Sequence, residues 1–462
     1  MAKKLWGGRF KKPTHPGFER FSSSLPVDCE LAAYDLEASK AHANGLARAG
    51  ILSRAAAAKI AKAIDAIAKD LPRLSREFGR RDIEDIHSLI ESELVRRIGD
   101  DAKRIHAGRS RNDQVNVATR LYCKRRLEAV ELEISRLQAA VVASAKAHRG
   151  IVVSGMTHLQ KAMPVLWSHW LLCYAEALDR SKTVIADTRR RLDVLTLGSG
   201  ALAGTGLAID REAVRKELGF ASVSRNSLDA VGSRDFVSET LYALAHLGVN
   251  LSRIAEDLMI FQIEELGMVD LPEELCTGSS MMPQKKNADF LELARGASSI
   301  LIGNSTALFA LQKGLPSSYN RDLQWDKEPL FRSMKLVEEM LPIFTVLFKG
   351  TKLRPERAAK SIMNDQLAAT DLAEALVEAG LPFRDAHERV GKLVREAESD
   401  GVPLRKVPEA KALEILGPSV KNWKAVLDPA LSVNRKRTSG STRPSEVDRQ
   451  IARWEKELHA SF

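Results

Sequence analysis

One loop of this sequence combines small, flexible residues with cations and an amide at fixed spacing. Residues 278–287 read Gly-Ser-Ser-Met-Met-Pro-Gln-Lys-Lys-Asn and lie between long helical patterns. A Gly-Ser-Ser start permits tight turns, and successive backbone N–H groups in such a turn can form a concavity that binds anions. Lys285 adds a positive charge, and Asn287 adds a donor and an acceptor. The loop can therefore bind a carboxylate and stabilise negative charge developing on it, although composition alone equally allows an ordinary linker between helices.

A second polar segment, residues 106–114, lies where a long helix is predicted to begin. It reads His-Ala-Gly-Arg-Ser-Arg-Asn-Asp-Gln. Gly108 permits close backbone approach, and Ser110, Arg111 and Asn112 supply hydrogen-bonding groups. The N–H groups of a helix N-terminus suit an anion, and so does an adjacent arginine. The segment predicts an anion site, and the alternative is a helix N-cap beside an exposed arginine.

Two histidines lie beside predicted helix starts. His158 belongs to the stretch Gly-Met-Thr-His-Leu-Gln, which precedes a helix predicted to start at Pro164, so we expect it in a loop. His87 ends the acidic run 82–87, which opens another helix, and acids also favour that position for purely structural reasons. A lone loop histidine is more often structural or exposed than catalytic. A role in the site remains open for each of them, and an imidazole has the advantage that it changes charge near neutral pH.

Long helices are expected to hold these segments in place. Apolar residues recur at steps of four, three, seven, three, four and three, which forms a heptad-like seam. The seam consists of Val237, Leu241, Leu244, Leu251, Ile254, Leu258 and Phe261. A helix of about 28 residues is roughly 42 Å long at 1.5 Å per residue. Because one small domain cannot cover both sides of such a helix, we interpret the seam as core of a long bundle shared between subunits.

The helical patterns change in length along the chain. They predict a mainly helical N-terminal domain over 1–107, a central long-helix domain over 108–354, and a small C-terminal helical domain over 355–462. In the last of these the helices shorten, with breaks at 380–382 and 401–403.

Composition limits the class of protein. The 462 residues include 70 basic and 60 acidic residues for a net charge of +10, and only 5% are aromatic, which favours helix. The charges are interspersed, and we interpret them, including the basic cluster 434–437, as solvated faces and not as a nucleic-acid surface. No uncharged apolar run approaches the ~20 residues that span a membrane, and residues 1–7 lack a signal-peptide pattern. The four cysteines form no Cys-x-x-Cys pair and no metal motif occurs, so we expect a cytoplasmic protein with reduced thiols and no metal.

These motifs together resemble the fumarase/aspartase superfamily. The loop 278–287 follows its general form, Gly-Ser-Ser-x-x-Pro-x-Lys-x-Asn, and residues 155–160 match its Gly-x-Thr-His-Leu-Gln motif. The Gln-Lys-Lys-Asn ending and the segment 106–114 resemble the argininosuccinate lyase branch, whereas fumarases and aspartases carry a Ser-Asn-Asp version of that segment. Ala288 departs from the proline usual there, which would favour a helix start, so the departure bears on the stiffness of the loop.

The resemblance spans nearly the whole chain and implies a fold and an activity. The fold is all-α, in three fumarase/aspartase-like parts with a long central helical bundle, in a homotetramer with a twenty-helix core and active sites shared between subunits. The activity is that of a lyase that cleaves argininosuccinate reversibly to arginine and fumarate in arginine biosynthesis. The partner is thus a small anionic substrate, and this β-elimination of a C–N bond requires no cofactor.

Matched positions imply a role for each site residue. The reaction removes a proton next to a carboxylate, so the site must stabilise a doubly charged oxyanion form. The match assigns Ser279 as the base, with Lys285 and Asn287 stabilising the charge. The guanidine leaving group favours protonation, and His158 with Glu292 as its partner is the first candidate for the acid, or for a group that only positions others. The remaining positions are expected to bind substrate: Ser24, His87, Arg111, Asn112, Thr157, Asn287, Tyr319, Gln324 and Lys327.

Other interpretations remain open. By composition the segment 314–328 is a surface connector, and Trp325 departs from the more polar residue common in the family. A sister lyase that releases fumarate, such as one acting on adenylosuccinate, would be expected to carry a different loop after the proline. A non-catalytic helical scaffold would not need the intact Ser279, His158 and Lys285.

Overall fold

The computed structural model describes residues 12–459. Residues 1–7, which lack a signal-peptide pattern, lie outside the described part. By internal contacts the chain divides into two compact units. Unit 1 is the chain up to Val130 together with Val184–Ala245 and Ser299–Val337. Unit 2 is Glu131–Thr183, His246–Ser298 and the chain from Glu338 onward. The three-part division along the sequence stays a prediction.

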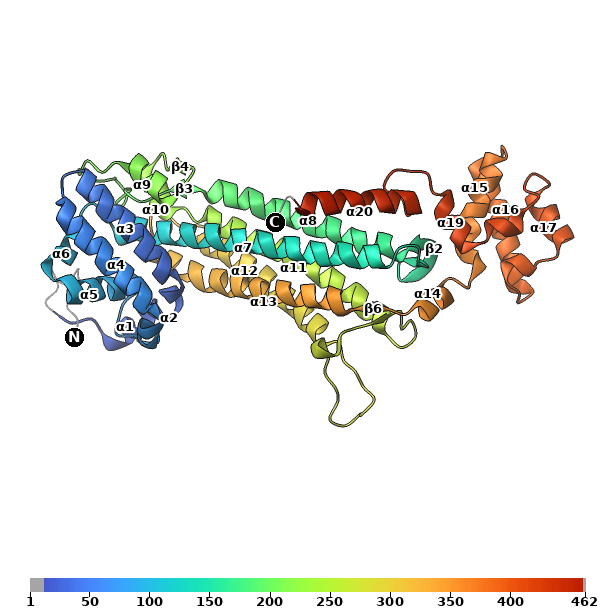
Figure 1. Cartoon of the computed structure of the whole chain (residues 1–462), viewed down its shortest axis with the longest axis horizontal. Coiled ribbons are helices and arrows are strands. Elements are labelled where there is room, and N and C mark those ends of the chain that lie inside the picture. The colour runs from blue at the N-terminus through green and yellow to red at the C-terminus, as the bar shows by residue number, and fades with distance from the viewer. Residues whose placement is uncertain (1–11, 460–462) are drawn as a thin grey trace. The chain divides into compact units, whose positions relative to one another are not determined.

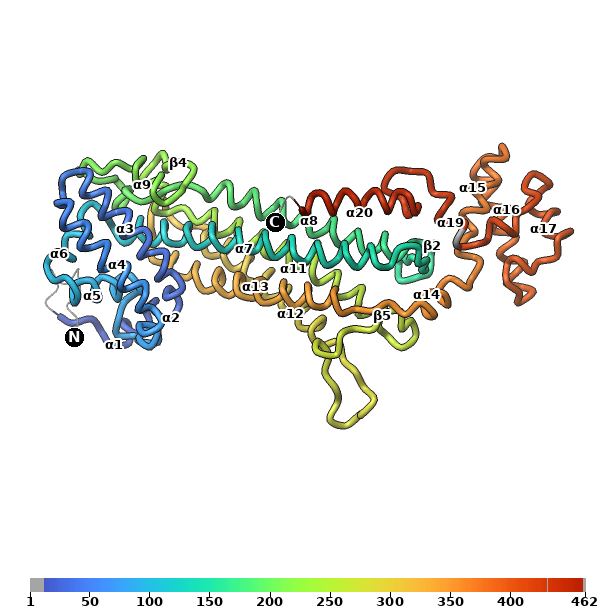
Figure 2. The backbone as a smooth tube through the Cα atoms, viewed as in Figure 1, coloured from blue at the N-terminus to red at the C-terminus, as the bar shows by residue number. Residues whose placement is uncertain are grey.

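Long helices dominate the described chain (Figure 1). Each of them contributes residues to both units. They are α7 (Arg111–Ala147), α8 (Trp167–Leu192), α11 (Asp235–Gln262), α12 (Asp289–Gln312) and α13 (Lys327–Gly350). Figure 2 shows the backbone of α7 coiling without a break. Every member of the predicted seam on α11 is buried within the single chain, which confirms that this stripe is core. The seam therefore needs no second subunit to cover it, and the sharing of the bundle between subunits stays a prediction.

Unit 1 adds the short helices of the N-terminal region. Its α-helices are α1 (Pro16–Ser22), α2 (Leu25–Asp28), α3 (Ala32–Arg48), α4 (Arg54–Leu74), α5 (Ile86–Ile98), α6 (Asp100–Lys103), α9 (Arg211–Leu218) and α10 (Ser227–Gly232). Its 3₁₀ helices are η2 (Cys29–Leu31), η3 (Ser75–Glu77), η4 (Arg104–His106) and η6 (Arg321–Asp326). The strands β3 (Val194–Leu195) and β4 (Ser222–Val223) pair in parallel.

Local sequence explains these helices. The Ser53 hydroxyl accepts the N–H of Ala56 at 3.1 Å and caps the start of α4. Ile60, Ile64 and Ile67 follow one face of α4 at helical spacing and are buried.

Unit 2 contains a β-hairpin of β1 (Val152–Thr157) and β2 (Gln160–Leu166). The predicted helix start at Pro164 is wrong, because Pro164 lies in β2 opposite Ser154 and α8 begins at Trp167. A two-stranded hairpin tolerates proline, since both strands are edges and the missing N–H needs no partner. A further antiparallel pair joins β5 (Val269–Asp270) to β6 (Lys352–Leu353).

The rest of unit 2 is helical. After the 3₁₀ turn η5 (Glu273–Leu275) come α14 (Pro355–Ser361), η7 (Asp365–Ala368), α15 (Ala369–Glu378), α16 (Phe383–Ser399), η8 (Leu404–Lys406), α17 (Glu409–Leu416), α18 (Trp423–Val426), α19 (Pro429–Arg435) and α20 (Pro444–His459). Leu376, Leu393 and Trp423 are fully buried in a core of their own. In the basic cluster, Lys436 Nζ lies 2.8 Å from Asp371 Oδ1. At least this cation is therefore engaged within unit 2.

Two features relevant to function are missing over residues 12–459. No helix there is long and apolar enough to cross a membrane. No group of three or more His, Cys, Asp or Glu side chains there could hold a metal ion.

Candidate active site

In unit 1 a buried carboxylate organises the predicted anion-binding segment. Asp85 Oδ1 accepts the N–H of Ser88 at 2.7 Å and caps α5, while Asp85 Oδ2 lies 2.9 Å from Arg111 Nε. Arg111 also donates to Gln114 Oε1 at 2.6 Å and to Ser88 Oγ at 3.1 Å. Burial raises the pKa of Asp85, but the charges of Arg111 and His87 outweigh it and hold the pKa below its usual value. The guanidinium is therefore held in one orientation at the start of α7.

Ser24 lies beside a second buried carboxylate. The Ser24 hydroxyl donates to Asp28 Oδ2 at 2.5 Å, and the N–H of Ile86 donates to Asp28 Oδ1 at 3.0 Å. Burial, followed by the charge of Asp85, raises the pKa of Asp28, and the charge of Lys327 acts in the opposite direction. Because the hydroxyl proton is engaged, the Ser24 oxygen is left with the capacity to accept a hydrogen bond.

His87 is held by a third carboxylate. Its Nδ1 lies 2.8 Å from Asp35 Oδ1, and the two side chains are 1% and 0% exposed. Gln114 Nε2 donates to the same oxygen at 2.7 Å. Burial raises the pKa of Asp35, but the charges of His87 and Arg109 outweigh it and lower the pKa to about 2. Within residues 12–459, His87 Nε2 has no hydrogen-bond partner. The imidazole therefore lies against Asp35 through Nδ1, and its Nε2 is a buried atom without a partner among these residues.

Gly108 and Asn112 make backbone and loop contacts. Gly108 has a φ of 67°, and a Cβ at this position would lie 2.9 Å from Ile209 Cδ1. The close approach predicted from the sequence is therefore made to the chain itself. Asn112 Nδ2 donates to the carbonyl of Ala201 at 3.0 Å.

The connector 314–328 and the start of α13 also belong to unit 1 and make contacts within it. Gln324 Nε2 donates to the carbonyl of Ser22 at 3.2 Å. Lys327 Nζ lies 2.6 Å from Asp326 Oδ1, and Asp326 Oδ2 lies 2.5 Å from Arg234 Nε. Burial raises the pKa of the Tyr319 phenol.

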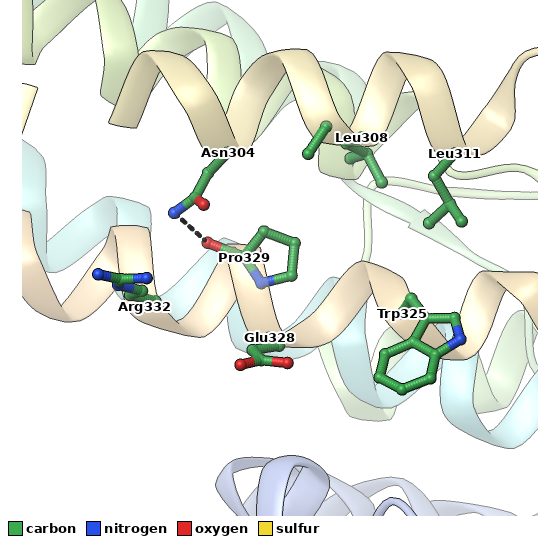
Figure 3. A pocket seen from close by; sticks show the side chains of 8 residues that line it. Asn304, Leu308, Leu311, Trp325, Glu328, Pro329 and Arg332 are labelled. Carbon is green, nitrogen blue, oxygen red and sulfur yellow. Dashed lines mark hydrogen bonds between the residues drawn. The ribbon is translucent and has the colours of Figure 1, made fainter. Parts of the chain in front are cut away.

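Trp325, the residue that departs from the family, lines a pocket of about 280 Å³ between α12 and α13. In Figure 3, Asn304 bonds to the carbonyl of Pro329, while Leu308 and Leu311 project from α12. Glu328 and Arg332 belong to α13. Predicted site residues do not line this pocket, so we do not place the reaction there.

In unit 2 the loop 278–287, the signature loop, is closed at its base by backbone hydrogen bonds. Thr277 N–H donates to the carbonyl of Asn287 at 3.1 Å, and Asn287 N–H donates back at 2.8 Å. Lys286 Nζ donates to the carbonyl of Leu271 at 2.7 Å and to Asp270 Oδ1 at 3.0 Å. The rest of the loop, drawn in yellow between α11 and α12 in Figure 1, is mostly exposed. Lys285 makes no side-chain hydrogen bond or ion pair with any described residue, so its charge is available to a ligand.

Ser279 accepts hydrogen bonds from its own loop. The N–H groups of Met281 and Met282 point at its hydroxyl oxygen at 3.3 Å and 3.1 Å. Donors aimed at an oxygen favour its negatively charged form. The Asn287 amide donates to the carbonyl of Gly278 at 3.5 Å, so it lies along the same loop.

Thr157 and His158 lie at the exposed tip of the hairpin. Thr157 pairs with Gln160, and the turn residues His158 and Leu159 have φ values of 55° and 59°. Residues other than glycine rarely adopt this left-handed conformation, and two in succession store strain of the kind that gathers at functional sites. Glu292 is exposed near the start of α12, and no hydrogen bond or ion pair joins it to His158 among the described residues of one chain.

Each unit therefore gathers its own set of predicted residues. Unit 1 gathers Ser24, His87, Arg111 and Lys327 around buried carboxylates, with Asn112, Tyr319 and Gln324 on the flanking segments. Unit 2 presents Ser279, Lys285 and Asn287 on the signature loop and Thr157 with His158 on the hairpin.

Sequence reasoning missed the carboxylates that position these residues. They are Asp28, Asp35, Asp85 and Asp326. The acidic run 82–87 predicts a helix start and resembles a stretch that lies near the substrate in argininosuccinate lyases, but it does not single out Asp85 as the partner of Arg111. Asp35 carried no local signal, because its partners His87 and Gln114 lie far away in the sequence. Asp28 and Asp326 lie close in sequence to Ser24 and Lys327, but only the fold shows that they are buried.

The comparison with protein families covers most of the chain. The family model described as "Lyase" matches residues 8–303, and the model described as "Argininosuccinate lyase C-terminal" matches residues 366–434. The argininosuccinate lyase of Chloroflexus aurantiacus is 42% identical over 460 residues, covering 99% of both chains. That of Herpetosiphon aurantiacus is 43% identical over 453 residues, covering 97% of this chain and 98% of its own.

Solved structures agree on the fold. An EDDS lyase in complex with formate superposes with a TM-score of 0.85 at 25% identity, covering 97% of this chain and 91% of its own. A class II fumarase from Schistosoma mansoni has a TM-score of 0.76 at 16% identity, covering 89% of this chain and 91% of its own. The predicted all-α, fumarase/aspartase-like fold is confirmed. On its motifs, its fold and its identity to these relatives, the chain belongs to the argininosuccinate lyase family of the fumarase/aspartase superfamily.

Proposed function

We propose that this chain cleaves argininosuccinate reversibly to arginine and fumarate, by β-elimination of a C–N bond. The observation that carries the proposal is the signature loop. Its Ser279 oxygen accepts two N–H groups, and its Lys285 ammonium has no partner among the described residues. The loop belongs to a chain that is 42% identical to a named argininosuccinate lyase over 460 residues.

Ser279 is proposed as the base that removes the proton next to the substrate carboxylate. A serine hydroxyl is a weak base unless its alkoxide is stabilised. The N–H groups of Met281 and Met282 supply that stabilisation at 3.3 Å and 3.1 Å. Lys285, six residues along the same exposed loop, adds a positive charge.

The charge that develops on the substrate needs fixed donors. When the proton leaves, the adjacent carboxylate takes up a second negative charge, and stabilising it is the largest task of the site. Lys285 and Asn287 are proposed for this role. The antiparallel bridge between Thr277 and Asn287 supports it, because it fixes the base of the loop that carries them.

His158 is proposed as the acid that protonates the guanidine leaving group, or as a group that positions this proton. Its exposed place at the hairpin tip leaves the imidazole free to meet substrate. Glu292 is proposed as its partner, but from another subunit. The absence of any bond between the two among the described residues of one chain supports that arrangement. A carboxylate at imidazole would fix the tautomer and orientation of the ring.

The unit 1 residues are proposed to bind the two ends of the substrate. Arg111, oriented by Asp85, offers its charge to a carboxylate. The Ser24 hydroxyl proton is engaged by Asp28, so this oxygen suits an N–H donor of the substrate instead. Thr157 of unit 2 and the remaining predicted residues are proposed for other substrate contacts: His87, Asn112, Tyr319, Gln324 and Lys327.

A homotetramer with sites built from Asn112, His158 and Ser279 of different chains is proposed as the active form. Apolar side chains remain exposed on the unit 1 stretches of α11 and α12. Tyr242 is 51%, Ile302 46% and Phe309 57% exposed. Exposed apolar side chains on neighbouring faces mark surfaces that partners cover. We also propose a cytoplasmic enzyme, because all four cysteines are free.

The test is a fumarate-release assay. Argininosuccinate should produce a rise in ultraviolet absorbance from fumarate, while adenylosuccinate, aspartate and EDDS should not. EDDS is included because the EDDS lyase shares the fold with a TM-score of 0.85. Release from adenylosuccinate alone would assign the chain to the sister reaction, and no release from any substrate would reject the proposal.

A further inference from the structure

The hairpin that carries Thr157 and His158 is anchored far from its tip. The Ser361 hydroxyl accepts the N–H of Ser154 at 3.1 Å, across 207 residues of sequence. The Thr442 hydroxyl accepts the N–H of Leu166 at 2.7 Å, across 276 residues. Both hydroxyl residues are 6% exposed. The C-terminal part of unit 2 therefore contacts both strands of this hairpin with buried hydrogen bonds.

The first anchor lies at an irregularity of the hairpin. The register of β1 against β2 shifts between Ser154 and Met156. A Cβ on Gly155 would lie 2.9 Å from the carbonyl of Met163, so only glycine fits the close approach. Such bulges re-aim the residues that follow and leave backbone groups without a partner in the ladder. Ser361 supplies an acceptor for the Ser154 N–H at this point, and its own hydroxyl donates to Ala358 at 2.6 Å.

The second anchor lies where β2 ends and α8 begins. Leu166 is the last residue of β2, and Trp167 is the first of α8. Thr442 approaches this junction from the turn before α20. That turn is fixed in place because Glu446 Oε1 accepts the N–H of Gly440 at 3.0 Å. The hydrogen bond from the Leu166 N–H to the Thr442 hydroxyl joins two buried groups. Leaving such a buried N–H without an acceptor is costly.

We propose that Ser361 and Thr442 are positioning residues for the reaction. They hold the base of the hairpin so that Thr157 and His158 meet the substrate at reacting distance. A two-stranded hairpin is marginally stable by itself, and the left-handed turn at its tip adds strain. The inference rests on the proposed role of His158. It goes beyond that role by assigning the position of the imidazole to residues that never touch substrate.

The test uses near-isosteric variants of the full-length, assembled enzyme. Thr442→Val removes the acceptor with little change in volume, and Thr442→Ser keeps it. We expect Thr442→Val to lower kcat by up to about a hundred-fold, the loss that a shift of a reacting group by about 1 Å can cause. Thr442→Ser should restore kcat. Ser361→Ala is a second, independent variant and should also lower kcat more than it raises KM for argininosuccinate.

Ser53→Ala is the matched control for lost stability. It also removes a serine acceptor from a backbone N–H, that of Ala56, but in unit 1. We expect it to lower Tm while kcat stays at the wild-type value. The inference is overturned if Thr442→Val and Ser361→Ala keep wild-type kcat, if Thr442→Ser fails to restore activity, or if Ser53→Ala loses as much activity.

His158→Asn, measured in the same assay, separates the two proposals. If His158→Asn is as active as the wild type, the proposed role of His158 fails whatever the anchors do. If His158→Asn is inactive but Thr442→Val and Ser361→Ala have wild-type kcat, the role of His158 stands and only the positioning inference falls.

Discussion

Arg111 Nε and Asp85 Oδ2 lie 2.9 Å apart and join the first residue of α7 to the N-cap of α5. The other guanidinium nitrogens bond to Gln114 and Ser88. A group with donors fixed in one plane can make all of these contacts at once. These contacts therefore hold the Arg111 guanidinium in one orientation at the N-terminus of α7.

Arg111→Lys should raise KM for argininosuccinate about ten-fold, the loss of one charged hydrogen bond of roughly 1.5 kcal/mol. A lysine keeps the charge but cannot contact Asp85, Gln114 and Ser88 together. Arg80→Lys is the control, because Arg80 also forms bonds to more than one carboxylate, at an exposed site. Steady-state kinetics on both variants check the prediction, and equal KM values for the two would contradict it.

Ser279→Ala should lower kcat by about 10²- to 10⁴-fold, as expected for the loss of a general base. Binding of argininosuccinate should survive, because Lys285, Asn287 and the loop N–H groups remain. Ser280→Ala is the neighbouring control and should be milder. Turnover assays and calorimetry measure the two effects, and an inactive Ser280→Ala beside a near-normal Ser279→Ala would move the base to Ser280.

His158→Asn should lower kcat much more than it lowers Tm. Asparagine tolerates the left-handed conformation that this turn position requires, so the hairpin should keep its fold. Leu159→Asn, at the other left-handed position and 70% exposed, is the matched control and should stay active. Kinetics and thermal melts of both variants decide, and unfolding of His158→Asn alone would make the histidine structural.

Phe309→Asp should dissociate the proposed tetramer and abolish activity, because it would bury a charge at the proposed contact between subunits. Phe383→Asp is the control, since Phe383 on α16 is exposed to the same 57% and no contact between subunits is proposed there. Analytical ultracentrifugation and the fumarate assay provide the readout. A stable, active monomer of the wild-type chain would refute the shared-site proposal.

Asp35→Asn should make the free energy of unfolding less sensitive to acid. The folded pKa of Asp35 is about 2, below the unfolded value of about 3.9. Its ionisation therefore stabilises the fold above pH ~3.9, and this contribution of about 2 kcal/mol is lost as pH falls towards 2. Urea unfolding at pH 6 and pH 3 should show a smaller drop for Asp35→Asn than for wild type. For Asp400→Asn, at an exposed carboxylate, the free energy of unfolding should drop between pH 6 and pH 3 as much as for wild type. An equally large drop for Asp35→Asn would count against the lowered pKa of Asp35.

The helices and the motif residues were predictable because their signals are local. The seam of α11 lies on one helical face, and its period is written in consecutive residues. The same holds for the loop that carries Ser279 and Lys285. The seam indicates that other helices cover this face of α11. Which helices do so is known only from the structure.

The hairpin around His158 was not predictable from local pattern. Pro164 was interpreted as a helix start, since proline suits that position, yet it pairs with Ser154 across the hairpin. Strand pairing depends on residues that meet through a turn, and this turn lacks the usual glycine or asparagine. The anchors at Ser361 and Thr442 lie still further away in sequence.

The arrangement of charge within the site was decided by tertiary structure alone. The sequence predicts that Arg111 belongs to an anion-binding segment and, through the family resemblance, that Lys327 binds substrate. It does not determine that Asp85 and Asp326 form ion pairs with them, or that Asp28 accepts a hydrogen bond from the Ser24 hydroxyl. A buried carboxylate is tolerated only where folding brings donors to it from separate elements. Asp326 is adjacent to Lys327 in the sequence, but its second partner, Arg234, reaches it only in the packed chain.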